Sequence, residues 1–96
     1  MTIRIADDAE NDLVRGARFY DSLEQGLGSY FIDSLFSDID SLSLYAGIHA
    51  KVWGYYRLLS QRFLYAIYYS IDHDIVVIHA VLDCRQDPDR AWERLG

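Results

Sequence analysis

The sequence has few residues of the kinds that staple or divide a chain: one cysteine and one proline among 96 residues. The single cysteine, Cys84, has no partner for an internal disulfide, which excludes the disulfide-rich class of small secreted domains. No proline-rich or low-complexity linker divides the chain, since Pro88 stands alone. We therefore expect one domain spanning residues 1–96 and a reducing compartment, the cytoplasm.

Long uncharged hydrophobic runs are also missing. No stretch is long enough and free enough of charge to span a bilayer, and the start Met1–Ile5 has no apolar run typical of a signal peptide. Yet 51% of the residues are hydrophobic and 15% are aromatic, which excludes the disordered class. We expect a folded domain without a membrane partner.

Positive charge is scarce as well, and the formal net charge is −6. This value argues against sequence-blind nucleic-acid binding, which depends on neutralising phosphates. The acidity lies in residues 1–50, where nine acidic residues face three arginines. Residues 51–96 hold six acidic and six basic residues, so a local basic patch is still possible there.

Metal and cofactor motifs are absent too. The histidines His49, His73 and His79 do not stand at zinc-ligand spacing with each other or with Cys84. Gly26 and its neighbour Gly28 do not form a phosphate-cradling motif and are better explained by a turn. We expect no metal and no cofactor.

The first half of the sequence has the pattern of a short strand followed by two helices. Ile3 and Ile5 alternate with polar residues, as in a half-buried strand. Asp7 or Asp8 is expected to cap the first helix and Ser29 the second, with a turn at Gly26 between them. Apolar residues at steps of three and four mark one face of each helix: Ala9, Leu13, Ala17, Tyr20 and Leu23, then Phe31, Leu35, Ile39 and Leu42.

The second half changes to a strand pattern. Residues 52–59, 62–71 and 75–82 are rich in aromatic and β-branched residues and predict a three-stranded meander. Asp87 and Pro88 are typical of a helix N-terminus and predict a closing helix over 89–95. The expected order is β-α-α-β-β-β-α, a two-layer α+β domain with a helical hairpin packed on an antiparallel sheet.

Three stretches of the sequence are similar to those of one known family. They are Ala17-Arg18-Phe19-Tyr20 with Gly26-Leu27-Gly28, the hairpin from Tyr56-Arg57 to Arg62–Tyr69, and the tail Ala80–Pro88. Together they resemble the RelE/ParE superfamily, the toxins of bacterial type II toxin–antitoxin modules, over nearly the whole chain. The resemblance implies a protein that arrests growth when it is free. It also implies a cognate antitoxin, encoded by an adjacent gene, which silences the toxin by wrapping around the sheet and the helical hairpin.

The resemblance leaves two targets open, because RelE-like toxins cut messenger RNA on the ribosome and ParE-like toxins inhibit DNA gyrase. RNA cleavage needs groups that move protons and a cation on the phosphate. Arg57, Arg62 and Arg85 match basic positions of the ribonuclease branch and could converge at one end of the sheet. Proton transfer would then fall to Lys51 or Tyr55.

The usual proton-transfer residues are not found, because no Tyr or His follows Leu82 and the strand 52–59 has no carboxylate. We therefore favour a non-enzymatic inhibitor of the ParE type. The RNA-cutting enzyme is the alternative, and a member that has lost toxicity is a third possibility.

We also expect two binding surfaces. Arg85, Arg90 and Arg94 are candidates for the target-facing patch. The alternatives are that Arg85 pairs with Asp83 or Asp87, and that Arg90 and Arg94 lie on a solvated face of the last helix. The antitoxin is expected to place basic residues against the acidic first half of the chain. We also expect it to contact tyrosine side chains, because tyrosine offers a large contact area at low entropic cost. These tyrosines are Tyr20, Tyr55, Tyr56, Tyr65, Tyr68 and Tyr69.

Overall fold

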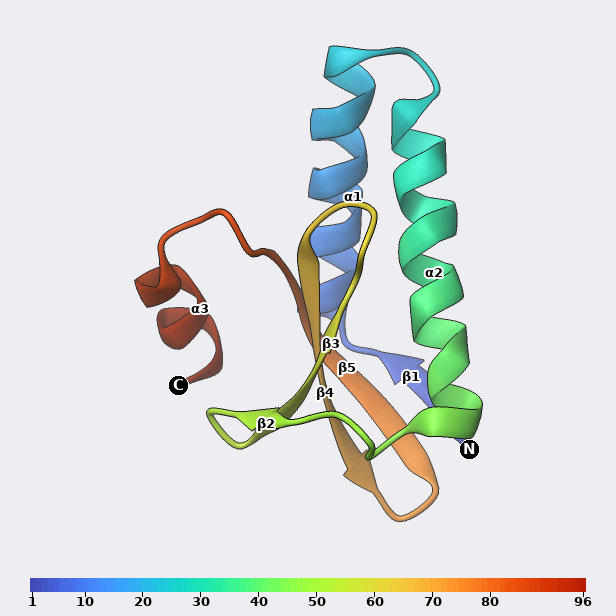
Figure 1. The fold of residues 1–96 in the computed structure, drawn as a ribbon, viewed down its shortest axis with the longest axis vertical. Helices are drawn as coiled ribbons and strands as arrows, with labels where there is room; N and C mark the ends of the chain where they lie inside the picture. The colour runs from blue at the N-terminus through green and yellow to red at the C-terminus, as the bar shows by residue number, and fades with distance from the viewer.

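The computed structural model describes residues 1–96 as a five-stranded sheet with two long helices on one face and a short helix on the other (Figure 1). The predicted α+β class, with a helical hairpin packed on the sheet, is confirmed. The elements are β1 (Thr2–Ile5), α1 (Asp7–Leu23), α2 (Leu27–Tyr45), β2 (Lys51–Val52), β3 (Tyr55–Leu59), β4 (Tyr65–Asp72), β5 (Ile75–Asp83) and α3 (Pro88–Leu95). None of the helices is both long and apolar enough to cross a membrane.

The strands lie in the order β1-β5-β4-β3-β2. Neighbours from β2 to β5 pair antiparallel, as predicted, whereas β1 runs parallel to β5 at one edge of the sheet. A parallel pair needs a long connection, and α1, α2 and the meander supply it. The register joins Thr2 to Ile75 and Ile5 to Ile78.

The predicted strand 52–59 is in fact a tight hairpin of two strands. Trp53 and Gly54 both have positive φ angles, 54° and 84°, which is typical of a two-residue hairpin turn. Val52 therefore pairs with Tyr55 across the turn. The order is β-α-α-β-β-β-β-α, one strand more than expected. The turn was not predicted because its first residue is Trp53, and a tryptophan rarely adopts a positive φ.

The strand predicted over 62–71 begins later, at Tyr65. Arg62 and Phe63 lie in the turn after β3, and Leu64 has a φ of 52°, which is incompatible with a strand. The turn places the Phe63 ring 4.8 Å from the Tyr20 ring and 5.2 Å from that of Phe31, measured between centroids. This loop therefore closes one end of the core.

Helices α1 and α3 differ in how their N-termini are capped. The N-cap of α1 is Ala6, with no side-chain cap, so the expected capping by Asp7 or Asp8 was wrong. Both aspartates lie in the first turn, where they favour the positive end of the helix dipole. In α3 the Asp87 carboxylate accepts a hydrogen bond from the Asp89 N–H, as the sequence predicted.

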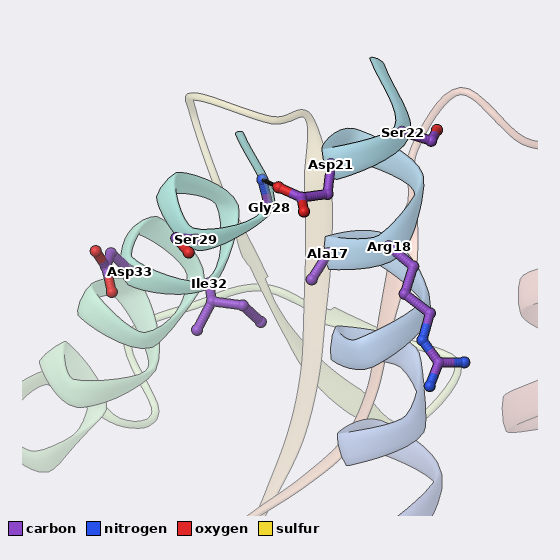
Figure 2. A pocket seen from close by; sticks show the side chains of 8 residues that line it. All are labelled: Ala17, Arg18, Asp21, Ser22, Gly28, Ser29, Ile32 and Asp33. Atoms are coloured by element: carbon purple, nitrogen blue, oxygen red, sulfur yellow. Dashed lines mark hydrogen bonds between the residues drawn. The ribbon is translucent and has the colours of Figure 1, made fainter. Parts of the chain in front are cut away.

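The start of α2 is capped from the neighbouring helix. Gly26, with a φ of 90°, precedes the helix, and Ser29 lies inside its first turn, so the expected Ser29 cap was wrong. Instead Asp21 Oδ1 of α1 accepts hydrogen bonds from the N–H groups of Gly26 and Gly28, at 3.0 and 3.1 Å. Figure 2 shows the bond from Gly28. A Cβ at Gly28 would lie 2.5 Å from the carbonyl oxygen of Ala17, so glycine permits this close helix contact.

The main core lies between the helical hairpin and the sheet. Alternation along β4 sends Tyr65, Ile67 and Tyr69 toward the helices and Ala66 and Tyr68 toward the opposite face. The buried residues of the main core are Ala9, Leu13, Tyr20, Phe31, Leu35, Ile39, Leu42, Phe63, Tyr65, Ile67, Tyr69, Val76, Ile78 and Val81. The helical faces predicted from the sequence are confirmed, except at Leu23, which is 64% exposed at the end of α1.

A smaller core lies on the opposite face, beneath α3. It consists of Ala66, Tyr68 and Ala80, with Leu82 and Leu95 packed against it. Strand β5 is therefore covered on both sides, as its continuous apolar run predicted. This second face carries the site described next.

Candidate functional site

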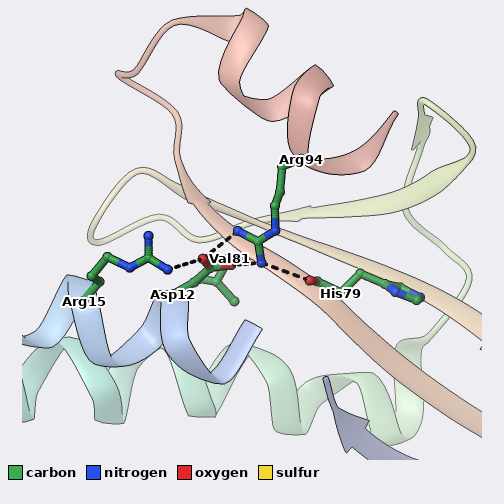
Figure 3. Close-up of polar contacts among 5 residues, drawn as sticks. All are labelled: Asp12, Arg15, His79, Val81 and Arg94. Atoms are coloured by element: carbon green, nitrogen blue, oxygen red, sulfur yellow. Dashed lines mark hydrogen bonds and ion pairs between the residues drawn. The ribbon is translucent and has the colours of Figure 1, made fainter. Parts of the chain in front are cut away.

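An acidic residue of α1 joins three elements at an open stretch of sheet edge. Strand β1 pairs with β5 only as far as Ile78, although β5 continues to Asp83. Beyond that point the Val81 N–H donates to Asp12 Oδ2 at 3.0 Å. Arg94 of α3 donates from both terminal nitrogens to the two Asp12 carboxylate oxygens, each at 2.8 Å (Figure 3).

The Asp12–Arg94 pair is well shielded from water. The Asp12 side chain is 5% exposed and that of Arg94 is 25% exposed. The hydrogen bonds from Arg94 to Asp12 raise the pKa of the guanidinium, so it stays charged. The pair fixes α3 to α1 around the edge of the sheet, and the target-binding role of Arg94 remains a prediction.

The pairing of Asp12 was not predicted from the sequence, although one signal for it was present. Asp12 lies next to Leu13, one helical turn beyond Ala9, and so near the buried face of α1. A carboxylate at such a position needs partners, because burying an unpaired charge is costly.

Arg85 is also engaged within the molecule. Its Nε and Nη2 donate to the Asp83 oxygens at 3.0 and 2.9 Å, and Nη2 also donates to the Tyr20 hydroxyl at 2.8 Å. The hydrogen bonds from Arg85 hold the pKa of Asp83 below its usual value. Of the alternatives left open by the sequence, pairing of Arg85 with Asp83 is the one observed.

Arg57 and Arg90 have no such partner. Neither forms an ion pair with an acidic residue, and both line a cavity of about 140 Å³ between the sheet and α3. The lining comes from β3, β4, β5, the β2–β3 turn, the β5–α3 connection and α3: Trp53, Arg57, Ala66, Tyr68, Leu82, Asp83, Cys84, Gln86, Asp87, Pro88, Arg90 and Ala91.

The residues proposed for RNA cleavage do not assemble into one site. The Arg62 guanidinium lies over the Tyr30 ring and donates to its hydroxyl, and neither Arg62 nor Arg85 lines the cavity of Arg57. Lys51 Nζ lies 4.9 Å from the centroid of the Tyr56 ring, which packs toward the helical hairpin. Tyr55 packs on the opposite face, so the two candidates for proton transfer are separated by the sheet.

The tyrosines predicted to bind an antitoxin differ widely in exposure. Tyr20, Tyr65, Tyr68 and Tyr69 are buried, with at most 7% of each residue exposed. Their buried rings pack in the two cores, so their contact with a partner stays a prediction. Tyr55 and Tyr56 are half-buried. Tyr30 and Tyr45, which were not predicted as contact residues, are 45% and 55% exposed.

A half-buried histidine, whose backbone carbonyl faces Arg94, makes stability depend on pH. His79 bonds to Ser70 Oγ, and burial together with the charge of Arg4 lowers its pKa below 6.5. Below pH 6.5 the unfolded chain therefore binds more protons than the folded one, and stability falls. We expect His79→Gln to flatten the dependence of the unfolding free energy on pH between 6.5 and about 5.

Chemical denaturation across that pH range measures this effect. His73→Gln is the matched control, because the His73 side chain is 95% exposed. His49, whose pKa burial also lowers, supplies the slope that remains in the His79 variant. An unchanged slope in His79→Gln would contradict the prediction.

No group of three or more His, Cys, Asp or Glu lies together in a way that holds a metal ion. No known family model matches the chain, and no curated protein matches its sequence. Among solved structures, it is similar to a chain of "Chromosomal ParDE TA system from P. aeruginosa", with a TM-score of 0.79 and 16% identity. The similarity covers 86% of this chain and 95% of that one, so the two chains share a fold.

Proposed function

We propose that this protein is the toxin of a type II toxin–antitoxin module, and that it inhibits growth by binding a macromolecular target. The observation that supports this most is the fold similarity to a chain of a ParDE toxin–antitoxin system over 86% of this chain. The resemblance of the three sequence stretches points to the same superfamily. DNA gyrase is the target we favour, with a cognate antitoxin as the second partner.

The arrangement of polar groups favours binding over RNA cleavage. General acid–base catalysis needs a proton-transfer group within hydrogen-bond reach of the reacting atoms. Lys51 and Tyr55 lie on opposite faces of the sheet, and no Tyr or His follows Leu82. Of the three arginines proposed to hold the phosphate, Arg85 is neutralised by Asp83.

The antitoxin is proposed to bind over the helical hairpin. Residues 7–45 hold nine acidic residues against Arg15 and Arg18, which suits a basic partner segment. A groove of about 590 Å³ runs between α1 and α2, lined by Asp21, Asp33 and Arg18 among others (Figure 2). Large apolar side chains are exposed on the same two helices: Val14, Phe19, Leu23, Tyr30, Phe36, Leu44 and Tyr45.

Controlled expression tests the toxin assignment. Inducing the chain alone is expected to arrest growth, and co-expressing the neighbouring open reading frame is expected to restore it. A DNA-damage response in the arrested cells supports gyrase as the target. Degradation of messenger RNA in the arrested cells supports the ribonuclease if the Arg62→Ala variant leaves the messages intact. Normal growth on induction alone, at confirmed expression of folded protein, contradicts the proposal and points to a member that has lost toxicity.

A further inference from the structure

In the cavity beneath α3, two guanidinium groups without ionic partners share one lining. Arg57 projects from β3 on the face opposite the helical hairpin, because it pairs in register with Tyr68. Arg90 reaches the cavity from α3. The two acidic residues that line the cavity already have other partners, since Asp83 is bound by Arg85 and Asp87 caps α3.

Aromatic side chains give the cavity a stable wall. The Trp53 ring stacks on Tyr68 with centroids 6.0 Å apart, and it lies 6.0 Å from the ring of Trp92 on α3. The Asp12–Arg94 pair holds α3 in place from the other side. The two arginines are therefore carried on elements that are fixed relative to one another.

The size of the cavity selects the ligand. Its volume of about 140 Å³ is well below the roughly 300 Å³ at which pockets for drug-sized ligands begin. One side-chain head group fills it, whereas a nucleotide does not fit. Two guanidinium groups suit a carboxylate, because each presents a planar set of donors to an anion.

We propose that the cavity takes an aspartate or glutamate side chain of the target protein, held between Arg57 and Arg90 and packed against Trp53. A protein ligand is favoured over RNA because the net charge of −6 opposes binding to a polyanion. This inference rests on the proposed function, and it moves the target-facing patch from Arg85 and Arg94, which are paired internally, to Arg57 with Arg90.

Selection from a random peptide library on the purified full-length chain tests the proposal directly. Enriched peptides are expected to carry Asp or Glu beside an apolar residue, and their binding is expected to change the fluorescence of Trp53, which lines the cavity. Arg57→Ala and Arg90→Ala are each expected to weaken binding by roughly tenfold or more. Arg57→Lys keeps the charge and is expected to weaken binding less, since a lysine cannot form the planar contact.

Arg15→Ala is the matched control, because Arg15 is an exposed arginine away from the cavity. Circular dichroism of each variant shows whether it is folded. Peptides whose affinity is the same in the Arg57 and Arg90 variants, or a selection that yields no acidic peptide, would overturn the proposal. Tighter binding of an oligouridylate, lost in the same two variants, would overturn it in favour of RNA.

The two proposals fail in different ways. Peptide binding is measured on the isolated protein and does not depend on toxicity. If growth arrest occurs but persists in both arginine variants, the toxin assignment stands and this inference fails. If acidic peptides bind through Arg57 and Arg90 but no arrest occurs, the binding site stands and the toxin assignment fails.

Discussion

Replacing Arg94 with alanine is expected to lower the free energy of unfolding by about 3 kcal/mol. The substitution removes two hydrogen bonds from Asp12 and leaves a carboxylate that is 5% exposed without its charge partner. The Asp12 carboxylate would keep only the hydrogen bond from the Val81 N–H and the exposed Arg15, whose Nη2 lies 3.8 Å from Oδ1. The loss is a large fraction of the roughly 5–15 kcal/mol that stabilises a typical domain.

Equilibrium unfolding in urea measures the effect, with Arg15→Ala as the matched control. Arg15 faces the same carboxylate at 3.8 Å, but its side chain is 74% exposed, so its removal is expected to cost less than about 0.5 kcal/mol. Equal losses in the two variants would contradict the role given to the Asp12–Arg94 pair. Loss of the Trp53–Trp92 contact in the Arg94 variant would show that the pair also positions α3.

Replacing Phe31 with alanine is expected to cost about 4 kcal/mol. Phe31 is fully buried, and its ring lies about 5 Å, between centroids, from the rings of Tyr20, Phe63 and Tyr65. It also fills the space over Gly16, where a Cβ would lie 2.6 Å from the ring. The cavity left behind has rigid walls on several elements, so collapse recovers little of the loss.

Phe36→Ala is the control on the same helix. Phe36 is 37% exposed, so its truncation removes less buried surface and is expected to cost about 1 kcal/mol. Thermal or urea unfolding of both variants checks the difference. A loss in Phe31→Ala no larger than in Phe36→Ala would contradict the placement of the core between α2 and the sheet.

Periodicity identified the helices and the core because both depend on many residues at once. The apolar face of α2 was predicted from Phe31, Leu35 and Ile39, which are all buried. The errors lie where one residue decides the backbone. Trp53 and Leu64 both adopt a positive φ. Glycine favours this conformation, but a tryptophan or a leucine in the sequence does not predict it.

The helix caps show a second kind of limit. A capping residue was sought next to each helix start, but α2 is capped by Asp21, which comes from the preceding helix. Likewise the parallel pairing of β1 with β5 joins residues more than seventy positions apart. Contacts between distant segments leave no local pattern.

The sequence predicted that arginines form the candidate site, but it did not predict which arginines lie together. The sequence proposed Arg85, Arg90 and Arg94 as one patch, but Arg85 and Arg94 each find an acidic partner in the fold. Arg57, which the sequence placed with the ribonuclease residues, shares a cavity with Arg90 instead. Which arginine finds a partner depends on Asp12 and Asp83, and thus on the tertiary structure.

The measurement that tests the central claim most directly is DNA supercoiling by purified gyrase in the presence of this protein. A ParE-like toxin that acts by binding is expected to block supercoiling, to lose this effect when the cognate antitoxin is added, and to leave ribosome-bound message intact. Supercoiling that continues unchanged, together with cleavage of ribosome-bound message by the same preparation, would contradict the account.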